Sequence, residues 1–598
     1  MQIQFKNNFI GYFRFYYSVV GARLLVNLGL CILVSFFDGI GLAMFMPLLQ
    51  SVSGTTTAVG GKAAMGKLHY VTEAIEGLGV SLTLNTVLVM LVVLFTFKGV
   101  LKLIQQSYQT RLRQTFMKKL RHSLVDGLQG VSYEGFLKLD SGKIQNTLTT
   151  EVQKVNQSMN GYFNASQACV MLVTYIALAF LANYQFAILV AIGAGLTNVL
   201  YRRIYLSTKR VSKSLSKKGS DFNGLLLQSV HNFKYLKATN YLSNFNKKLK
   251  KVINKTEQLN KRIGMYSAIT ISMKEPMIIT VVVAVIYFQI NVIGSSFTTI
   301  LLSLLLFYRA LSFLVTVQNH WHVFVQNIGS LESVAELSGY LYKQKEAKAD
   351  KAFTTLQGKI ELRDVQFSYG THKVLNAINI TIPKNQTIAL IGESGSGKTT
   401  LANMISCLIE PQEGKMLVDN VAISEYDLDT FRSKIGYISQ EPVIFNDDIY
   451  NNITFWAERT DENIARFWDT IELAALSDFI SRQPEQEKTK LGDNGILISG
   501  GQKQRISIAR ELYKQAEILI LDEATSALDS ETEKVIKENI DALRGKYTIV
   551  VIAHRLSTIR NVDNIFLMDK GNVMASGAFD QLIEASGKFK RMVELQEF

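Results

Sequence analysis

The 598-residue sequence has very few cysteines, and they lie far apart. They are Cys31, Cys169 and Cys407, the first two within apolar runs. This spacing excludes a disulfide framework and a cysteine-based metal site, and it predicts that each thiol acts as a small buried hydrophobic group. A small-residue cleavage site before the first long apolar run is also missing. We therefore expect no removable signal peptide.

Acidic residues are scarce in the first part of the chain. Residues 1–350 contain 36 Lys and Arg but only 14 Asp and Glu, whereas residues 351–598 contain 28 Lys and Arg and 36 Asp and Glu. A basic, apolar part joined to an acidic part indicates a membrane protein with basic cytoplasmic loops. Nucleic-acid binding is the other common cause of such a charge. It is disfavoured because the basic residues flank apolar runs and no nucleic-acid reader motif is present.

Apolar runs long enough to cross a bilayer, about 20 residues each, are frequent. There are six, at residues 20–50, 84–107, 162–184, 185–206, 266–293 and 297–324. Two polar stretches, 108–160 and 207–265, carry clusters of Lys and Arg and have helical apolar spacing. If the spans alternate in direction, both stretches lie on the cytoplasmic side. We predict a transmembrane domain over residues 1–340, whose helices extend into the cytoplasm.

The segment between the first two spans has two interpretations. Residues 51–61 are small and polar and are typical of a loop, whereas residues 64–78 place apolar side chains at helical spacing. The second part fits an amphipathic helix on the outer membrane surface. It fits an ordinary extracytoplasmic loop equally well.

A linker rich in Lys, Glu and Ala follows at residues 341–357. Beyond it, over residues 358–598, expected strands and helices alternate. Such alternation predicts an α/β domain with a largely parallel core.

A phosphate-binding loop directly follows the apolar run 387–391, which we expect to be a buried strand. It fits G-x-x-x-x-G-K-[ST] and comprises Gly392, Glu393, Ser394, Gly395, Ser396, Gly397, Lys398 and Thr399, with Thr400 next to it. The glycines let backbone N–H groups surround phosphate oxygens, Lys398 reaches the β- and γ-phosphates, and Thr399 can ligate Mg²⁺. The helix that follows directs its positive end at the anion. We predict that this domain binds a nucleoside triphosphate.

A second apolar run, residues 518–521, ends in two carboxylates, Asp522 and Glu523. In a chain with a phosphate loop, Asp522 is expected in the Mg²⁺ shell. Glu523 is expected to orient and deprotonate the attacking water.

A second anion site is expected at Ser499, Gly500, Gly501 and Gln502, where a serine and two glycines open a helix. This run resembles the signature motif of the ATP-binding cassette (ABC) superfamily, although Ile498 stands where that family usually has Leu. The resemblance implies that the signature acts in trans, on the γ-phosphate of ATP held by a partner's phosphate loop.

Further landmarks of that family occur in the same order. Tyr369 matches the aromatic residue that stacks on adenine, Gln440 the glutamine that senses Mg²⁺, and His554 the histidine that contacts the γ-phosphate. Residues 526–529 match the loop that bridges the two nucleotide sites. Residues 489–493 resemble the loop by which exporters couple to their membrane helices, with Asp493 where Glu is commoner.

The resemblance extends over the whole chain, because six spans followed by one cassette are the layout of a half-size ABC exporter. It implies an α-helical six-span domain before the ATPase domain, ATP and Mg²⁺ as cofactors, a homodimer, and a place in the bacterial inner membrane. Short coupling helices are expected near residues 140–145 and 231–235. An importer is disfavoured because permease and cassette are fused. A soluble ABC ATPase is disfavoured by the spans.

Charged residues within the spans bear on the cargo, because such charges are costly unless they face a cavity or a partner. Asp38 lies in the first span, Lys98 in the second and Arg309 in the sixth. We expect Lys98 to extend to a membrane interface. Arg309 has two interpretations: it binds a phosphate or pyrophosphate in the cavity, or it forms a structural salt bridge, for example to Asp38.

Local runs such as residues 36–41, 232–237 and 307–309 are similar to those of bacterial lipid-linked oligosaccharide flippases. That similarity implies a polyprenyl-pyrophosphate glycolipid as cargo, with Arg309 and Asp38 at the substrate site. The alternative is a multidrug, lipid or peptide exporter with a largely apolar cavity.

Overall fold

The computed structural model describes residues 8–45, 77, 83–182, 184–291, 297–522, 538, 541–553 and 558–595. The chain forms two compact units. One consists of Met1–Val131 and Gly135–Lys345, and the other of Ser132–Glu134 and Glu346–Phe598. The expected loop at residues 51–61 and the expected surface helix at residues 64–78 lie outside the described residues, apart from Gly77.

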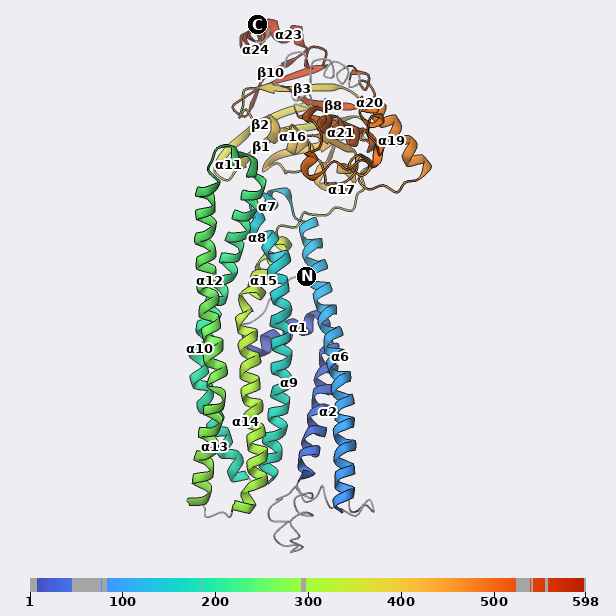
Figure 1. Cartoon of the computed structure of the whole chain (residues 1–598). Helices are drawn as coiled ribbons and strands as arrows, with labels where there is room; N and C mark the ends of the chain where they lie inside the picture. The colour runs from blue at the N-terminus through green and yellow to red at the C-terminus, as the bar shows by residue number, and fades with distance from the viewer. Residues whose placement is uncertain are drawn as a thin grey trace. The chain divides into compact units, whose positions relative to one another are not determined.

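The first unit is built from long helices joined by short ones (Figure 1). The bounds are α1 (Phe9–Val20), α2 (Arg23–Ala43), α6 (Leu84–Gln129), α7 (Tyr133–Leu137), α8 (Ser141–Asn146), the π-helix η2 (Thr147–Glu151), α9 (Val152–Ala182), α10 (Tyr184–His231), α11 (Phe233–Ala238), α12 (Leu242–Ser272), α13 (Lys274–Asn291), α14 (Phe297–Gln326) and α15 (Ile328–Lys343). Within the described ranges, four helical stretches are long and apolar enough to span a membrane: Arg23–Leu42, Leu84–Gln129, Ser141–Phe180 and Leu242–Phe288. The remaining predicted spans, 185–206 and 297–324, coincide with parts of α10 and α14.

Several helices are far longer than a bilayer requires. α6 has 46 residues and α10 has 48, which gives each a length of about 70 Å at 1.5 Å per residue. The polar stretches are therefore helical continuations of the spans, as predicted. The short helices α8 and α11 occupy the two positions where coupling helices were expected, and the Asp140 carboxylate caps α8 by accepting a 2.7 Å hydrogen bond from the Lys143 amide.

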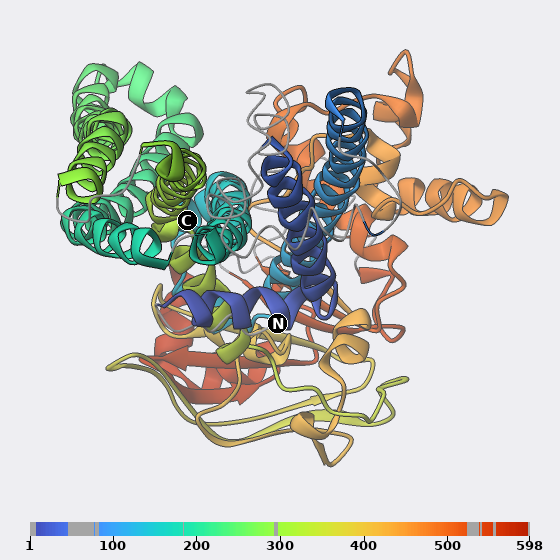
Figure 2. The same ribbon diagram turned by 90° about the horizontal axis from the view of Figure 1, so that it is seen from below.

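The long helices pack in pairs: α2 with α6, α9 with α14, and α10 with α12 (Figure 2). The α9–α14 contact depends on Gly161, where a Cβ atom would lie 2.8 Å from the backbone nitrogen of Phe324. Only glycine allows the two backbones to approach so closely. Beside it, α1 inserts buried aromatic rings, including Tyr12 and Tyr16, into a core formed with α6, α9, α14 and α15.

The second unit contains two sheets. Their strands are β1 (Lys359–Tyr369), β2 (His372–Pro383), β3 (Thr387–Gly392), β4 (Glu413–Val418), β5 (Val421–Ala422), β6 (Ile435–Ile438), β7 (Ile518–Asp522), β8 (Thr548–Ile552), β9 (Asn564–Asp569) and β10 (Asn572–Gly577). The larger sheet has the order β10-β9-β3-β8-β7-β6 and is parallel except at β10. The smaller one, β2-β1-β4-β5, is antiparallel.

Helices complete this unit. They are α16 (Lys398–Ile405), α17 (Leu428–Ser433), α18 (Ile449–Thr454), α19 (Asp461–Leu473), α20 (Ser477–Ser481), α21 (Gly500–Tyr513), α23 (Phe579–Ala585) and α24 (Gly587–Glu594), with 3₁₀ turns η3 (Ile423–Glu425), η4 (Gln486–Lys488) and η5 (Asp493–Gly495). A helical membrane domain followed by an α/β domain with a largely parallel sheet confirms the predicted fold class.

Candidate nucleotide and cargo sites

The phosphate loop connects the fully buried strand β3 to helix α16. At Gly392 a Cβ atom would lie 2.2 Å from the carbonyl oxygen of Met568, so no other residue fits there. Gly395 and Gly397 have φ angles of +80° and +104°, a region that favours glycine. These glycines shape the turn that the sequence motif predicts.

Lys398 lies inside this loop. Its Nζ donates hydrogen bonds to the carbonyl oxygens of Gly392, at 2.8 Å, and Glu393, at 3.0 Å. The Ser396 hydroxyl is buried in the same loop and has no hydrogen-bond partner among the residues that the structure describes. A phosphate oxygen would satisfy this hydroxyl, since buried polar groups are rarely left unpaired. Ser394 and Thr399 are exposed, and Thr400 is buried.

The phosphate loop and two predicted residues lie at the carboxyl ends of strands that run in the same direction. The phosphate loop follows β3, Asp522 ends β7, and Gln440 comes two residues after β6. Because β3, β8, β7 and β6 are parallel neighbours, their carboxyl ends meet at one edge, where ligands bind in such sheets. Glu523, His554 and the 526–529 loop lie outside the described residues.

Asp522 has a phenol beside it. The Tyr437 hydroxyl on β6 donates a 3.4 Å hydrogen bond to Asp522 Oδ2. Burial and the neighbouring carboxylate raise the pKa of Tyr437 well above its ordinary value. The phenol therefore stays protonated and orients the carboxylate.

The signature run opens helix α21. The Ser499 hydroxyl accepts from the Gln502 amide at 3.3 Å, and the Gln502 side chain accepts from the Ser499 amide at 2.8 Å. This reciprocal capping box fixes the helix start, while Ser499 and Gly500 are exposed and Gly501 is half-buried. α21 packs against α18 and α19. Tyr369, the expected adenine platform, ends β1 and is 41% exposed.

In the membrane unit, Asp38 pairs with Lys98 rather than with Arg309. Lys98 Nζ donates to Asp38 Oδ1, and the Tyr175 hydroxyl donates to Asp38 Oδ2 at 2.7 Å. The expectation that Lys98 extends to an interface is therefore wrong, because a buried carboxylate on α2 holds it. The proposed Arg309–Asp38 bridge is likewise absent from the described ion pairs.

Asp38, Lys98 and Arg309 line a pocket of about 390 Å³ between α2, α6, α9 and α14. Its polar lining is Asp38, Lys98, Lys102, Gln106, Asn164, Gln167, Arg309, Thr316 and His320. Lys102 and Gln106 are not among the residues predicted for this site from the sequence. Their signal was present, since Lys98, Lys102 and Gln106 recur every four residues in an apolar run and so share one face of α6.

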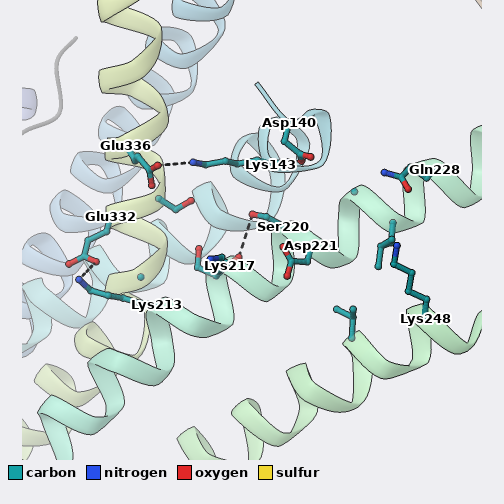
Figure 3. Close-up of a pocket in the computed structure, with 16 residues that line it drawn as sticks. Asp140, Lys143, Lys213, Lys217, Ser220, Asp221, Gln228, Lys248, Glu332 and Glu336 are labelled. Atoms are coloured by element: carbon teal, nitrogen blue, oxygen red, sulfur yellow. Dashed lines mark hydrogen bonds and ion pairs between the residues drawn. The ribbon is translucent and has the colours of Figure 1, made fainter. Parts of the chain in front are cut away.

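A larger pocket of about 890 Å³ lies between α8, α10, α12 and α15 (Figure 3). Its four lysines are matched by four carboxylates, including the pairs Lys143–Glu336 at 2.8 Å and Lys213–Glu332 at 2.7 Å. That lining is electrically balanced. Among its described lining residues, the pocket between α2, α6, α9 and α14 has three cations against one carboxylate, and it is the better candidate for an anionic ligand.

Comparison with known proteins gives the family. Residues 28–315 match the family model of the ABC transporter transmembrane region, and residues 375–526 match the ABC transporter family model. The heterocyst differentiation ATP-binding protein HepA of Nostoc sp. is 32% identical over 80% of this chain and 79% of its own length. An ATP-dependent lipid A-core flippase of Francisella tularensis subsp. holarctica is 29% identical over 84% of this chain and 83% of its own length.

The fold also matches a solved structure. A bacterial Atm1-family ABC exporter with ATP bound has a TM-score of 0.77 at 22% identity, over 97% of this chain and 99% of that one. The chain belongs to the ABC transporter family and is a half-size exporter that couples ATP hydrolysis to transport across a membrane.

Proposed function

We propose that the chain works as a homodimer in a bacterial inner membrane and moves a lipid-linked oligosaccharide, a polyprenyl-pyrophosphate glycolipid, out of the cytoplasmic leaflet. The observation that carries this proposal is the cationic pocket at membrane depth. Arg309 and Lys102 are exposed in it, and neither forms an ion pair within the described part of the chain. Unpaired cations at this depth are costly unless a ligand meets them.

A pyrophosphate diester suits these two side chains. It carries two negative charges, and the planar guanidinium of Arg309 offers paired N–H donors for phosphate oxygens. The side-chain amides of Gln106, Asn164 and Gln167 line the same pocket. They supply hydrogen bonds of the kind that sugar hydroxyls use.

ATP would be shared between two copies of the chain. Lys398 and the loop amides hold the phosphates in one copy, and Ser499, Gly500 and Gly501 of the other copy close over the γ-phosphate. Tyr369 stacks on the base. Glu523 orients and deprotonates the attacking water, and His554 contacts the γ-phosphate. Closure of the cassettes would turn the cavity outward, and hydrolysis would reset it.

The same edge suits Mg²⁺. Thr399, Gln440 and Asp522 offer a hydroxyl, an amide and a carboxylate, the oxygen ligands that this hard cation prefers. Tyr437 orients the Asp522 carboxylate. When bound, Mg²⁺ neutralises charge on the β- and γ-phosphates.

The second candidate, a multidrug, lipid or peptide exporter with an apolar cavity, has less support. The polar lining of the pocket opposes a purely apolar cargo. Within this second candidate, the similarity to proteins named lipid A-core flippases favours a lipid over a drug or a peptide.

The test is ATP-dependent flipping of a fluorescent polyprenyl-pyrophosphate oligosaccharide in proteoliposomes. We expect wild type to flip it. Glu523→Gln should fail for lack of hydrolysis, and Arg309→Ala should fail while still hydrolysing ATP. Tyr308→Ala is the matched control, because Tyr308 is exposed next to Arg309 but does not line the pocket.

Two results would refute the proposal that the cargo is a lipid-linked oligosaccharide. One is a wild-type protein that hydrolyses ATP but moves none of this lipid. The other is an Arg309→Ala variant that moves it at the wild-type rate.

A further inference from the structure

We infer that Asp38 sets the number of negative charges that the membrane pocket accepts, because it withholds Lys98 from the ligand. The inference rests on the proposed transport of a pyrophosphate lipid and deepens it. It makes Asp38 a specificity-determining residue that acts through its counter-ion.

The Asp38 carboxylate is fully engaged. One oxygen pairs with Lys98 on α6, and the other accepts the 2.7 Å hydrogen bond from Tyr175 on α9. The Asp38 side chain is only 7% exposed, and that of Lys98 is 21% exposed. Tyr175 is itself held by a stacked contact with Phe313, whose ring centroid lies 5.3 Å away. The ion pair is therefore part of the pocket wall before any ligand arrives.

The other two cations remain available. Lys102 lies one helical turn from Lys98, and Arg309 reaches the pocket from α14. With Lys98 neutralised by Asp38, the described lining residues have a net charge of +2, counting His320 as neutral. A ligand with two negative charges balances it. A ligand with three would leave one charge uncompensated at membrane depth.

A purely structural role for the pair predicts something different. If the ion pair only ties α2 to α6, loss of either partner has the same effect. If Asp38 sets the charge, Asp38→Asn raises the net charge to +3 and Lys98→Gln lowers it to +1. The two variants then change anion binding in opposite directions. The amide introduced by Asp38→Asn retains an oxygen that can accept from Tyr175, so that contact is preserved.

The experiment measures equilibrium binding to the nucleotide-free, full-length protein in nanodiscs of neutral lipid. The probe is a fluorescent short-chain prenyl pyrophosphate monoester with three charges, and the uncharged prenyl alcohol is the reference. We expect Asp38→Asn to tighten pyrophosphate binding about tenfold and Lys98→Gln to weaken it about tenfold, as one added or lost charge at short range predicts. The double variant should bind as wild type does, and the alcohol should not distinguish the variants.

Equal weakening by both single variants would overturn the inference in favour of a helix tether. The inference would also be overturned if no form of the protein bound the prenyl pyrophosphate more tightly than the prenyl alcohol. The assay contains neither sugar nor ATP. The two single variants could therefore shift pyrophosphate binding in opposite directions while the wild-type protein fails to flip the glycolipid. That combination would refute the proposed cargo and leave the role of Asp38 standing.

Discussion

Lys398 Nζ lies 2.8 Å from the carbonyl oxygen of Gly392, the first residue of the phosphate loop that carries it. The loop thus holds the ammonium group against its own backbone. A bound phosphate would compete for that group, since charge-assisted hydrogen bonds are the stronger ones.

Loss of this ammonium group should weaken ATP binding. We predict that Lys398→Ala lowers affinity about 10- to 100-fold, the worth of a hydrogen bond to a charged group. Titration with a fluorescent ATP analogue measures it. Lys588→Ala is the control, because Lys588 contacts the exposed Glu393 side chain and Asp569, each at 3.0 Å, and should leave affinity within about threefold. Equal affinities for Lys398→Ala and wild type would contradict the assignment.

A methyl group added between α9 and α14 should destabilise the membrane unit. Gly161→Ala places its Cβ 2.8 Å from the Phe324 nitrogen and 3.0 Å from the His320 carbonyl oxygen. We predict a loss of about 1–3 kcal/mol in unfolding free energy, seen as a lower melting temperature in detergent. Gly264→Ala on α12 is the control, since no described residue has an atom within 4 Å of its added Cβ, and it should be neutral or slightly stabilising.

The buried Arg510 joins α21 to two neighbouring segments. Its guanidinium donates to the carbonyl oxygens of Asn452 at 2.7 Å and Val443 at 2.8 Å. Arg510→Gln leaves these acceptors unpaired, and we predict a loss of about 2–4 kcal/mol. The measurement is the midpoint of chemical denaturation, monitored by the loss of ATPase activity. The control is Arg591→Gln on α24, where the arginine is exposed. Equal midpoints for the two variants would show that the buried bonds contribute little.

Asp447 should make stability depend on pH at the acid end. Hydrogen bonds from the Trp456 indole at 2.7 Å, from Asn451 and from the Asp448 amide hold the pKa of this carboxyl below its ordinary value. The ionised form is thus favoured by folding. The contribution of ionised Asp447 to the free energy of unfolding is complete above about pH 4, the pKa of an Asp in the unfolded chain. This contribution is lost as the pH falls through the lower pKa of Asp447 in the folded protein.

Asp447→Asn should remove this part of the acid dependence. The measurement is the difference in melting temperature between about pH 6 and pH 3. We expect a smaller difference for the variant than for wild type. An unchanged difference would mean that these hydrogen bonds do not favour the charged form.

The sequence predicted the nucleotide domain well because its signals are local. A glycine loop after a buried strand, as at Gly392–Thr399, specifies its own turn, and Ser499 with Gln502 specifies its own helix cap. The spans and their polar extensions followed from hydropathy and helical spacing, which the 46-residue α6 bears out.

The partner of Asp38 could not be predicted in the same way. Lys98 is 60 residues away, on another helix. Which cation meets the carboxylate depends on the relative rotation and depth of α2, α6 and α14. Apolar runs specify these only loosely, because any face of a span can meet lipid. The sequence therefore left Arg309 open as a partner of Asp38, whereas packing brings Lys98 and Tyr175 to Asp38.

The most direct test of the proposed cargo site is an experimental structure of the nucleotide-free protein with a polyprenyl-pyrophosphate oligosaccharide bound. We predict pyrophosphate density between Lys102 and Arg309, with the Asp38–Lys98 pair intact beside it. Density for the lipid chain at that place, or a headgroup bound elsewhere, would contradict the proposal.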